Sequence, residues 1–317
     1  MLATSPQTIR ISADAQRDPL LFTKLTPPSI RANPIARPRL TDALAHGARG
    51  PLTLISAPAG YGKTTLLSAW ARQGAAPLAW LSLDRNDNDP LHFWAYLIAA
   101  LRTVNPDCGA AALALIGSPQ PPPTTTALTL LLNDLATCAS SCVLVLDDYH
   151  LIDNPAIHQA LGFVLEHRPP NLHLILAGRS VPALPLARLR ARGQLVELRA
   201  ADLRCTRAEA TIFLSDHMQL TLPPDALAML ASRTEGWLAG LHLAALAVQG
   251  AADGLGVVHA LSGTQQMIRD YLIDEVFDQQ PHAIQQFLLQ TAILERLNAR
   301  LCDALRNGSA PARSSDS

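Results

Sequence analysis

Short, continuous runs of apolar residues alternate with amphipathic segments between residues 52 and 198. The apolar runs, which we predict to be strands, are 52–56, 78–83, 142–146, 172–177 and 195–198. Their positions are apolar in succession rather than alternately, as in strands that are covered on both faces. The segments with helical spacing of apolar positions are 63–73, 90–104, 125–139 and 155–167. This alternation predicts an α/β fold in which helices flank a parallel sheet.

The strand patterns end near residue 200, and helical patterns follow. A capping box at Thr206–Glu209 is expected to begin one helix, and Pro223–Pro224 suits the first turn of another. Apolar residues recur on one helical face from Trp237 to Val248. A last helical pair is predicted at about 265–278 and 281–295. The second half of the chain is therefore expected to be helical.

Composition and charge exclude several classes of protein. The 317 residues include 25 Lys and Arg against 26 Asp and Glu, and 49% of them are hydrophobic. A net charge of −1 argues against binding to nucleic acid or an anionic membrane through overall charge, and the apolar content excludes a disordered chain. No signal peptide or membrane span is evident. Five cysteines without metal-ligand spacing are typical of reduced thiols, so we expect a cytoplasmic protein.

The strongest chemical signal is a glycine-rich turn between the first predicted strand and the helix after it. Its sequence, APAGYGKTT at 57–65, is that of a phosphate-binding loop in the setting that such a loop requires. Gly60 and Gly62 allow backbone N–H groups to point at phosphate oxygens, and the helix N-terminus favours negative charge. Lys63 is expected to reach the β- and γ-phosphates, and Thr64 to offer its hydroxyl to Mg²⁺. The predicted nucleotide-binding residues are Ala59, Gly60, Tyr61, Gly62, Lys63, Thr64 and Thr65.

Two adjacent acids follow the apolar run at 142–146. Asp147 and Asp148 would lie at the carboxyl end of a parallel strand, where ligands bind in sheets of this kind. We expect Asp147 to hold Mg²⁺ through water, together with Thr64, and Asp148 to act as the base or water-positioning acid of ATP hydrolysis. A simple Asp–Asp turn explains the acids but not their combination with a phosphate-binding loop.

The spacing of the two motifs, with the predicted strand at 78–83 between them, indicates a particular P-loop subclass. In that subclass an extra strand lies between the phosphate-binding strand and the acidic strand. A polar residue at the tip of the next strand then senses the γ-phosphate. Arg179 follows the run at 172–177 and has the reach and the fixed charge for this role. An ordinary surface arginine fits the position equally well, so the sequence leaves the role of Arg179 open.

Basic residues also gather between Arg188 and Arg207. The six arginines of this cluster are Arg188, Arg190, Arg192, Arg199, Arg204 and Arg207. They could contact nucleic acid, phosphates or a protein partner, but no aromatic residues interleave to stack on bases. Most such clusters are solvated surfaces. A nucleic-acid-binding ATPase is therefore carried as a third hypothesis.

Several longer segments make the chain resemble a known family. From about residue 21 to 306 it is similar to the N-terminal half of the MalT-like, LuxR-type ATP-binding transcriptional regulators, which belong to the STAND class of signal-transduction NTPases. The segments that carry the resemblance are TKLTPP (23–28), RPRL (37–40), SAPAGYGKTTL (56–66), WLSLD with DNDP and FWAYL (80–97), VLVLDDYHLI (143–152), LPLARLRARGQL (184–195), TEGWLAGLHLAAL (234–246), YLIDEVFDQQP (271–281) and FLLQTAILERLNARLCDAL (287–305).

This resemblance implies a module that closes over ATP or ADP. Its expected parts are a flexible leader (1–20), a P-loop NTPase core with an N-terminal base-contacting segment (21–200), an all-helical lid (201–260), a partial winged-helix-like domain (261–306) and a disordered tail (307–317). The resemblance also implies roles for single residues. The nucleotide base would contact Arg37 and Pro38, while the family's nucleotide and Mg²⁺ positions match Lys63, Thr64, Asp147, Asp148 and Arg179. The lid stretch at 240–243 lacks the proline that packs on adenine in related proteins.

The same resemblance implies that the module is a switch. In such proteins the ADP form is closed and inactive, and exchange for ATP permits self-association. Slow ATP hydrolysis then resets the switch. In such proteins DNA is bound only by a C-terminal helix-turn-helix, and the inducer is bound by helical repeats. This chain shows neither pattern after residue 306. We therefore expect a switch module without sensor or DNA reader. A free-standing ATPase or adaptor that acts through protein contacts is the alternative.

Overall fold

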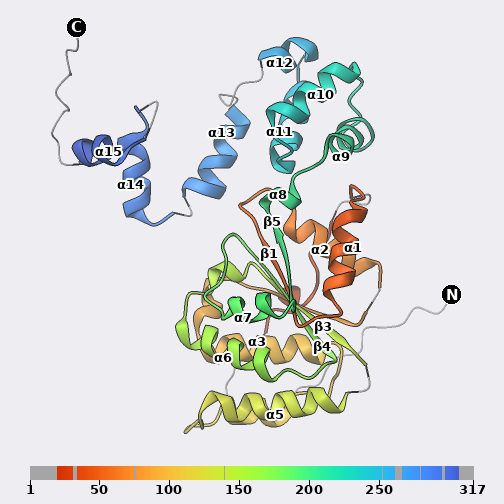
Figure 1. Ribbon diagram of the computed structural model, residues 1–317, viewed down its shortest axis with the longest axis vertical. Coiled ribbons are helices and arrows are strands. Elements are labelled where there is room, and N and C mark those ends of the chain that lie inside the picture. Colours follow the sequence, from red (N-terminus) through yellow and green to blue (C-terminus); the bar gives the residue numbers. More distant parts are fainter. Residues whose placement is uncertain are drawn as a thin grey trace.

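A five-stranded parallel sheet forms the centre of the first part of the molecule (Figure 1). The computed structural model describes residues 20–30, 34–74, 76–138, 140–251, 253–260, 266–278, 280–294 and 297–306. The strands are β1 (Leu52–Ser56), β2 (Leu78–Ser82), β3 (Cys142–Asp147), β4 (Leu172–Gly178) and β5 (Leu195–Arg199). Every pair of neighbouring strands is parallel. The predicted strands and the α/β class are therefore confirmed.

The order of the strands across the sheet is β2-β3-β4-β1-β5. Strand β4 lies between β1, which leads into the phosphate-binding loop, and β3, which ends at the two acids. The sheet thus has the extra central strand that the motif spacing indicated. That strand is β4, whereas β2, which separates the two motifs along the chain, lies at the edge. Sequence separation alone could not show which strand is inserted.

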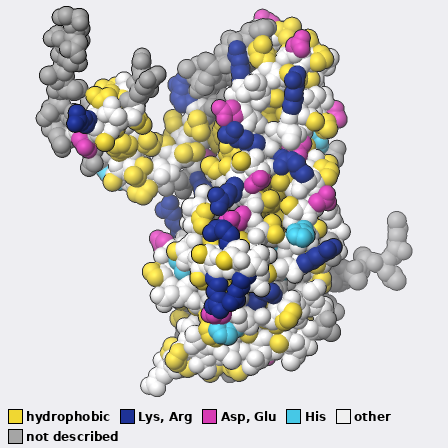
Figure 2. All heavy atoms as spheres, in the orientation of Figure 1, with side chains coloured by type: hydrophobic (Ala, Val, Ile, Leu, Met, Phe, Trp, Pro, Cys, Tyr) yellow, Lys and Arg dark blue, Asp and Glu magenta, His cyan; other side chains and the backbone are white. Residues whose placement is uncertain are grey.

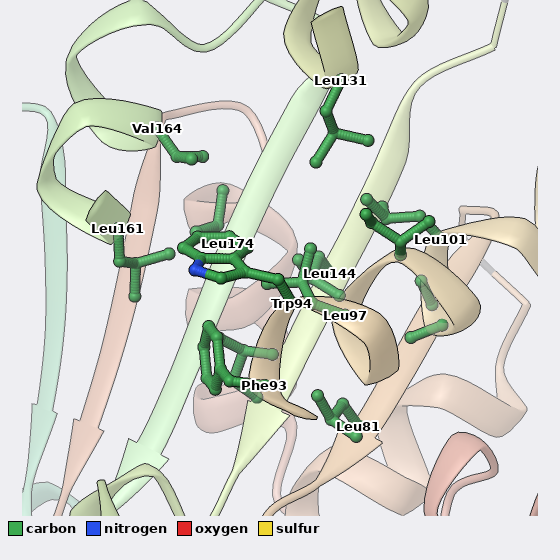
Figure 3. Close-up of a cluster of buried hydrophobic side chains, with 14 of the residues drawn as sticks. Leu81, Phe93, Trp94, Leu97, Leu101, Leu131, Leu144, Leu161, Val164 and Leu174 are labelled. Carbon is green, nitrogen blue, oxygen red and sulfur yellow. The ribbon is translucent and has the colours of Figure 1, made fainter. Parts of the chain in front are cut away.

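Each face of the sheet carries its own hydrophobic core, because alternate residues of a strand point to opposite faces. Leu144 and Leu174 face one core with Trp94, while Val145 and Ile175 face the other. Figure 3 shows Trp94 set among leucines of the strands and of the covering helices, next to Leu161. Burial on both faces explains why these strands read as continuous apolar runs.

Helices cover both cores (Figure 1), and the later residues Leu186 and Leu203 also reach the first and the second core respectively. The covering helices are α3 (Pro90–Arg102), α4 (Ala110–Ile116), α5 (Thr124–Thr137) and α6 (Pro155–His167) on one face, and α1 (Pro38–Gly47) and α2 (Lys63–Arg72) on the other. Side-chain caps and proline define two of the starts. The side chain of Asp89 accepts the N–H of His92 before Pro90, and Asn154 accepts the N–H of Ala156 around Pro155. The sequence pattern located α2, α3, α5 and α6 to within two residues at each end.

Helices follow the sheet, as the sequence predicted. They are α8 (Ala200–Leu203), α9 (Arg207–Ile212), α10 (Pro224–Arg233), α11 (Leu238–Gln249) and α12 (Gly254–Ala260), whereas α7 (Leu186–Ala191) lies between β4 and β5. The capping box is present, since Thr206 and Glu209 each accept the other's backbone N–H. Leu230, Leu241 and Ala245 belong to a third hydrophobic core that these helices share. The helical part after residue 200 therefore has a core of its own.

The last described elements are α13 (Gln266–Leu272), the π-helical turn η5 (Ile273–Phe277), α14 (His282–Thr291) and α15 (Ala299–Arg306). In this part of the chain, α13 packs against α11, whereas α14 and α15 extend away from the helical part (Figure 1). Among the described residues, no helix combines the length and the apolar content that crossing a bilayer requires. All five cysteines are free thiols. The leader expected at 1–20 lies outside the described residues except for Leu20, and so does the tail expected at 307–317.

Candidate functional site

The phosphate-binding loop adopts, at two positions, a backbone conformation that favours glycine. Gly60 and Gly62 have φ angles of 78° and 76°, in the left-handed region. Space excludes side chains as well, because a Cβ added to Gly60 would lie 2.6 Å from the Cβ of Ala239. The loop leads directly into the N-terminus of α2, which begins at Lys63. The predicted glycines are thus required by conformation and by packing.

Lys63 lies at the start of α2 and is buried. Its Nζ donates to the carbonyl oxygens of Ala57, at 2.8 Å, and Pro58, at 3.0 Å. Burial lowers the pKa of Lys63, and the charge of Arg179 lowers it further, while Asp148 and Asp147 raise it. Lys63, Arg179 and both acids therefore lie within electrostatic reach of one another.

Asp147 ends β3 and is 1% exposed. Burial raises the pKa of its carboxyl to about 6, and the charge of Asp148 raises it further, against a hydrogen bond from Thr64 and the charge of Lys63. The Thr64 hydroxyl and the Asp147 carboxylate thus meet where the sequence placed a Mg²⁺ site. A hydroxyl and a carboxylate are hard oxygen ligands, which Mg²⁺ takes together with water and phosphate oxygens. Within the described ranges, no cluster of three His, Cys, Asp or Glu offers a metal site of another kind.

The raised pKa of Asp147 predicts how stability depends on pH. The folded chain binds the Asp147 proton up to a pH of about 6, whereas the unfolded chain releases it near 3.8. This residue therefore destabilises the fold above about pH 6, and the penalty disappears as the pH falls towards 4. We expect Asp147→Asn to raise the free energy of unfolding of the nucleotide-free protein by about 1–3 kcal/mol at pH 7. Urea denaturation at pH 7 and pH 5 checks this, and an equal gain at both values would contradict it.

Asp148 follows β3 with a φ of 56°, a left-handed conformation that Asp and Asn tolerate better than other side chains. Its carboxylate is about half exposed and lies 3.8 Å from Nδ1 of His150. Burial lowers the pKa of His150, and Asp148 partly offsets this. The structure thus places the Asp148 carboxylate at the solvent side of the site, while Asp147 lies inside.

Arg179 follows directly after β4, beside the ends of β1 and β3. Its Nη2 donates to Oε2 of Glu275 at 3.0 Å, and its Nη1 donates to the backbone carbonyl of Glu275. The same guanidinium also acts on the pKa of Lys63. Arg179 is therefore not an isolated surface arginine, because it pairs with Glu275 and lies near Lys63. Its role towards a phosphate stays a proposal.

A cavity of about 340 Å³ adjoins the loop on the side of α1 and α2. Its lining includes Pro38, Thr65 and Leu238, and also Arg37. The Arg37 guanidinium is occupied elsewhere, since its Nη2 donates to the carbonyl oxygens of Leu203 and Arg204. Pro38 and the segment before it therefore form the wall expected of a base-binding pocket. The Arg37 guanidinium instead fastens this wall to the helical part.

The helical part closes on the phosphate-binding loop through the start of α11. Trp237 Nε1 donates to the carbonyl of Ala59 at 3.0 Å, and the N–H of Ala239 donates to the carbonyl of Gly60, also at 3.0 Å. Leu238, between them, lines the cavity. These contacts lie just before the stretch 240–243, which lacks the proline that packs on adenine in related proteins. In the sequence, Gly236 and Trp237 at the start of α11 are the residues that could have indicated a contact with the loop.

The arginine cluster between Arg188 and Arg207 is largely paired with acids. The pairs are Arg188 with Glu166, Arg190 and Arg199 with Glu197, and Arg204 with Glu235. Figure 2 shows acidic side chains among the basic ones on the displayed face, where basic side chains gather over the lower centre of the molecule. Arginines that are already paired with acids neutralise fewer phosphates, and so they release fewer counterions from a nucleic acid. This surface therefore gives little support to direct binding of nucleic acid.

Comparison with known proteins points to one group of regulators. The MalT winged helix domain family matches residues 273–314. The HTH-type transcriptional regulator MalT of Cronobacter sakazakii is 37% identical over 287 residues, and that of Yersinia pestis is 37% identical over 284. Each match covers 89% of this chain but 31% of the relative. The chain thus spans about a third of the length of the curated relatives that it matches.

Two solved structures with a similar fold are named as ATPases. A Walker-type ATPase of Pyrococcus abyssi aligns with a TM-score of 0.59 and 16% identity, over 93% of this chain and 90% of that one. A Signal Transduction ATPase with Numerous Domains (STAND) protein with a tetratricopeptide repeat sensor, from Pyrococcus horikoshii, aligns with a TM-score of 0.52 and 13% identity. That alignment covers 92% of this chain and 39% of the other. At this level of identity the likeness establishes the fold.

Proposed function

The chain is a homologue of the MalT-like transcriptional regulators over the 31% of their length that it matches, and from this relationship we propose that it is a nucleotide-controlled switch module that binds ATP and ADP. One observation carries the proposal. The phosphate-binding loop, the two acids and Arg179 meet at one end of the sheet, and α11 closes on the loop. Such an arrangement fits a polyphosphate held between core and lid.

We propose that Mg²⁺ accompanies the nucleotide. Thr64 and Asp147 fit the ion, because the Thr64 hydroxyl lies close enough to the buried Asp147 carboxylate to lower its pKa. A bound Mg²⁺ supplies charge neutralisation between phosphate oxygens. Binding requires the ionised carboxylate, so the Mg²⁺-dependent part of nucleotide affinity is expected to fall below pH 6.

Binding of nucleotide by the purified chain tests the proposal directly. Titration calorimetry with ATP and with ADP, each with and without Mg²⁺, should show saturable binding of both nucleotides. A circular dichroism spectrum of the same sample establishes that the protein is folded. The proposal is wrong if folded protein binds neither nucleotide at millimolar concentration.

Slow hydrolysis is the second part of the proposal, with Asp148 as the base that orients or activates water. Asp148→Asn keeps the shape and tolerates the left-handed backbone, but removes the proton acceptor. We expect turnover of ATP to slow by about tenfold, less than for an enclosed general base because the carboxylate is half exposed, with ATP affinity changed by less than about twofold. Single-turnover assays and binding titrations check this. Equal losses in both would assign Asp148 to metal binding instead.

The larger function of the protein is also a proposal. We propose that ATP favours self-association and that the protein works in the cytoplasm. We also propose that DNA is bound only through a separate C-terminal domain, since the relatives are named HTH-type transcriptional regulators. A free-standing ATPase or adaptor is the second candidate. It is favoured by apolar side chains that α14 and its flanks expose, among them Leu289, Ile293 and Leu297 at 61–77%. Light scattering with ADP and with a non-hydrolysable ATP analogue distinguishes nucleotide-dependent self-association from its absence.

A further inference from the structure

Two residues from one turn of the C-terminal part reach the phosphate-binding end of the sheet. Tyr271 and Glu275 are four residues apart at the junction of α13 and η5, so they lie on the same helical face. The Tyr271 ring packs edge-on against Trp237, with centroids 5.6 Å apart, and its hydroxyl lies against Gly60. Glu275 meets Arg179. Single π-helical turns such as η5 occur frequently at functional sites.

Glu275 engages Arg179 in two ways. Its carboxylate accepts a hydrogen bond from Nη2 at 3.0 Å, and its backbone carbonyl accepts one from Nη1. Both terminal nitrogens of the guanidinium are therefore directed at Glu275. The planar guanidinium fork fits a carboxylate and a phosphate equally well. A carboxylate on Arg179 consequently occupies the hydrogen-bonding groups that a phosphate at the same end of the sheet would need.

We propose that Glu275 determines nucleotide specificity by competing with the terminal phosphate of a nucleoside triphosphate for Arg179. This inference rests on the proposed nucleotide-binding function. A nucleoside diphosphate binds the loop and leaves the Arg179–Glu275 pair intact. A triphosphate must displace the Glu275 carboxylate before its γ-phosphate reaches Arg179. The pair therefore lowers the affinity for ATP and leaves the affinity for ADP unchanged.

The competition also couples the nucleotide to the C-terminal part. If the pair disfavours ATP, then ATP disfavours the pair by the same factor, because linkage is reciprocal. Loss of the pair would remove one of the contacts, beside those of Tyr271, that hold this part at this end of the sheet. The factor is modest, since the Arg179 and Glu275 side chains are 30% and 47% exposed and water screens their attraction. Exposed pairs of this kind correspond to an equilibrium change of about fivefold or less.

The test compares the ratio of ATP to ADP affinity in matched variants. Glu275→Gln removes the charge and keeps the shape and the backbone carbonyl. Asp274→Asn is the control, since it removes one charge from the neighbouring, exposed residue of the same turn. We expect Glu275→Gln to raise the ratio about threefold to fivefold in favour of ATP, with ADP affinity unchanged and the control within about 1.5-fold. A ratio for Glu275→Gln that stays within the range of the control overturns the proposal.

A second measurement asks whether Glu275 acts through Arg179. In an Arg179→Ala background, Glu275→Gln is expected to leave the ratio unchanged, because the shared group is gone. The same shift in both backgrounds would mean that Glu275 repels the triphosphate from a distance, and it overturns the proposal. If the wild type binds neither nucleotide, the proposed function fails as well. Binding of both with an unaltered ratio refutes the role of Glu275 alone.

Discussion

Replacement of Lys63 by alanine is expected to abolish nucleotide binding, with a loss of affinity of about 100-fold or more for both ATP and ADP. The ammonium lies between the phosphate-binding loop and the two acids, where it is buried and shares hydrogen bonds only with the carbonyls of Ala57 and Pro58. A phosphate would offer it charge-assisted hydrogen bonds in place of neutral ones, and two such bonds correspond to about 3 kcal/mol or more. Both nucleotides carry the β-phosphate, so both should be affected.

A matched control separates the loss of this contact from the loss of a positive charge. Arg72 ends the same helix and is exposed, so Arg72→Ala changes the net charge equally without touching the site. We expect the affinity of Arg72→Ala for ATP and ADP to lie within about twofold of that of the wild type. Calorimetric titration of the three proteins, each shown to be folded by circular dichroism, gives the comparison. Binding by Lys63→Ala within a factor of three of the wild type would contradict the assigned role of Lys63.

Much of the proposed nucleotide site could be predicted because its signals are local. A glycine with a left-handed φ, a lysine at a helix start and acids after a buried strand are each readable within a few residues. The parallel sheet then brings the strand ends together at one edge, so the topology alone places the loop after β1, Asp147 at the end of β3 and Arg179 after β4 near one another. This is why the predicted residues 60–65 and Asp147 lie together.

The contacts that close the site could not be predicted, because they join distant parts of the chain. Nothing near Glu275 in the sequence indicates Arg179, which lies 96 positions away. Similarly, Trp237 appeared as part of an apolar helical face, whereas its indole N–H bonds to the loop carbonyl of Ala59. The family resemblance implies that Arg37 contacts the base, and Arg37 does line the cavity, but the bonds of its guanidinium to the helical part had no signal in the sequence. Local patterns carry no information on which surface of one part meets which surface of another.

One carboxylate at the junction between the core and the helical part interacts with two arginines. Glu209 accepts hydrogen bonds from Arg39 Nε at 2.9 Å and Nη2 at 3.0 Å, and it lies 3.4 Å from Nε of the buried Arg37. Burial raises the pKa of Glu209, but the hydrogen bonds from Arg39 and Thr206 and the charge of Arg37 together hold it below its ordinary value. Both arginines flank Pro38 at the start of α1, whereas Glu209 lies in α9. The carboxylate thus binds the wall of the proposed base pocket to the helical part.

Glu209→Ala is expected to lower the free energy of unfolding by about 3 kcal/mol at pH 7, because it leaves the Arg37 charge buried without a carboxylate and also removes half of the capping box. Glu197→Ala is the matched control. Glu197 also pairs with two arginines, but Arg190 and Arg199 are 49% and 61% exposed, so its loss should cost less than about 1 kcal/mol. Urea denaturation of both variants measures the difference, and equal costs would show that burial of Arg37 contributes nothing to the junction.

The pH dependence provides an independent check on Glu209. Its folded pKa is lowered from an ordinary value of 4.5, so the stability that it contributes is complete above that value and is lost as the pH falls through the folded pKa. The deficit of Glu209→Ala should therefore shrink in acid, since the wild type then loses the same charge. Asp147 acts in the opposite sense, because its pKa is raised. Opposite slopes for the two variants would place one carboxylate in a structural junction and the other in a site that holds an unstable charge until a cation binds.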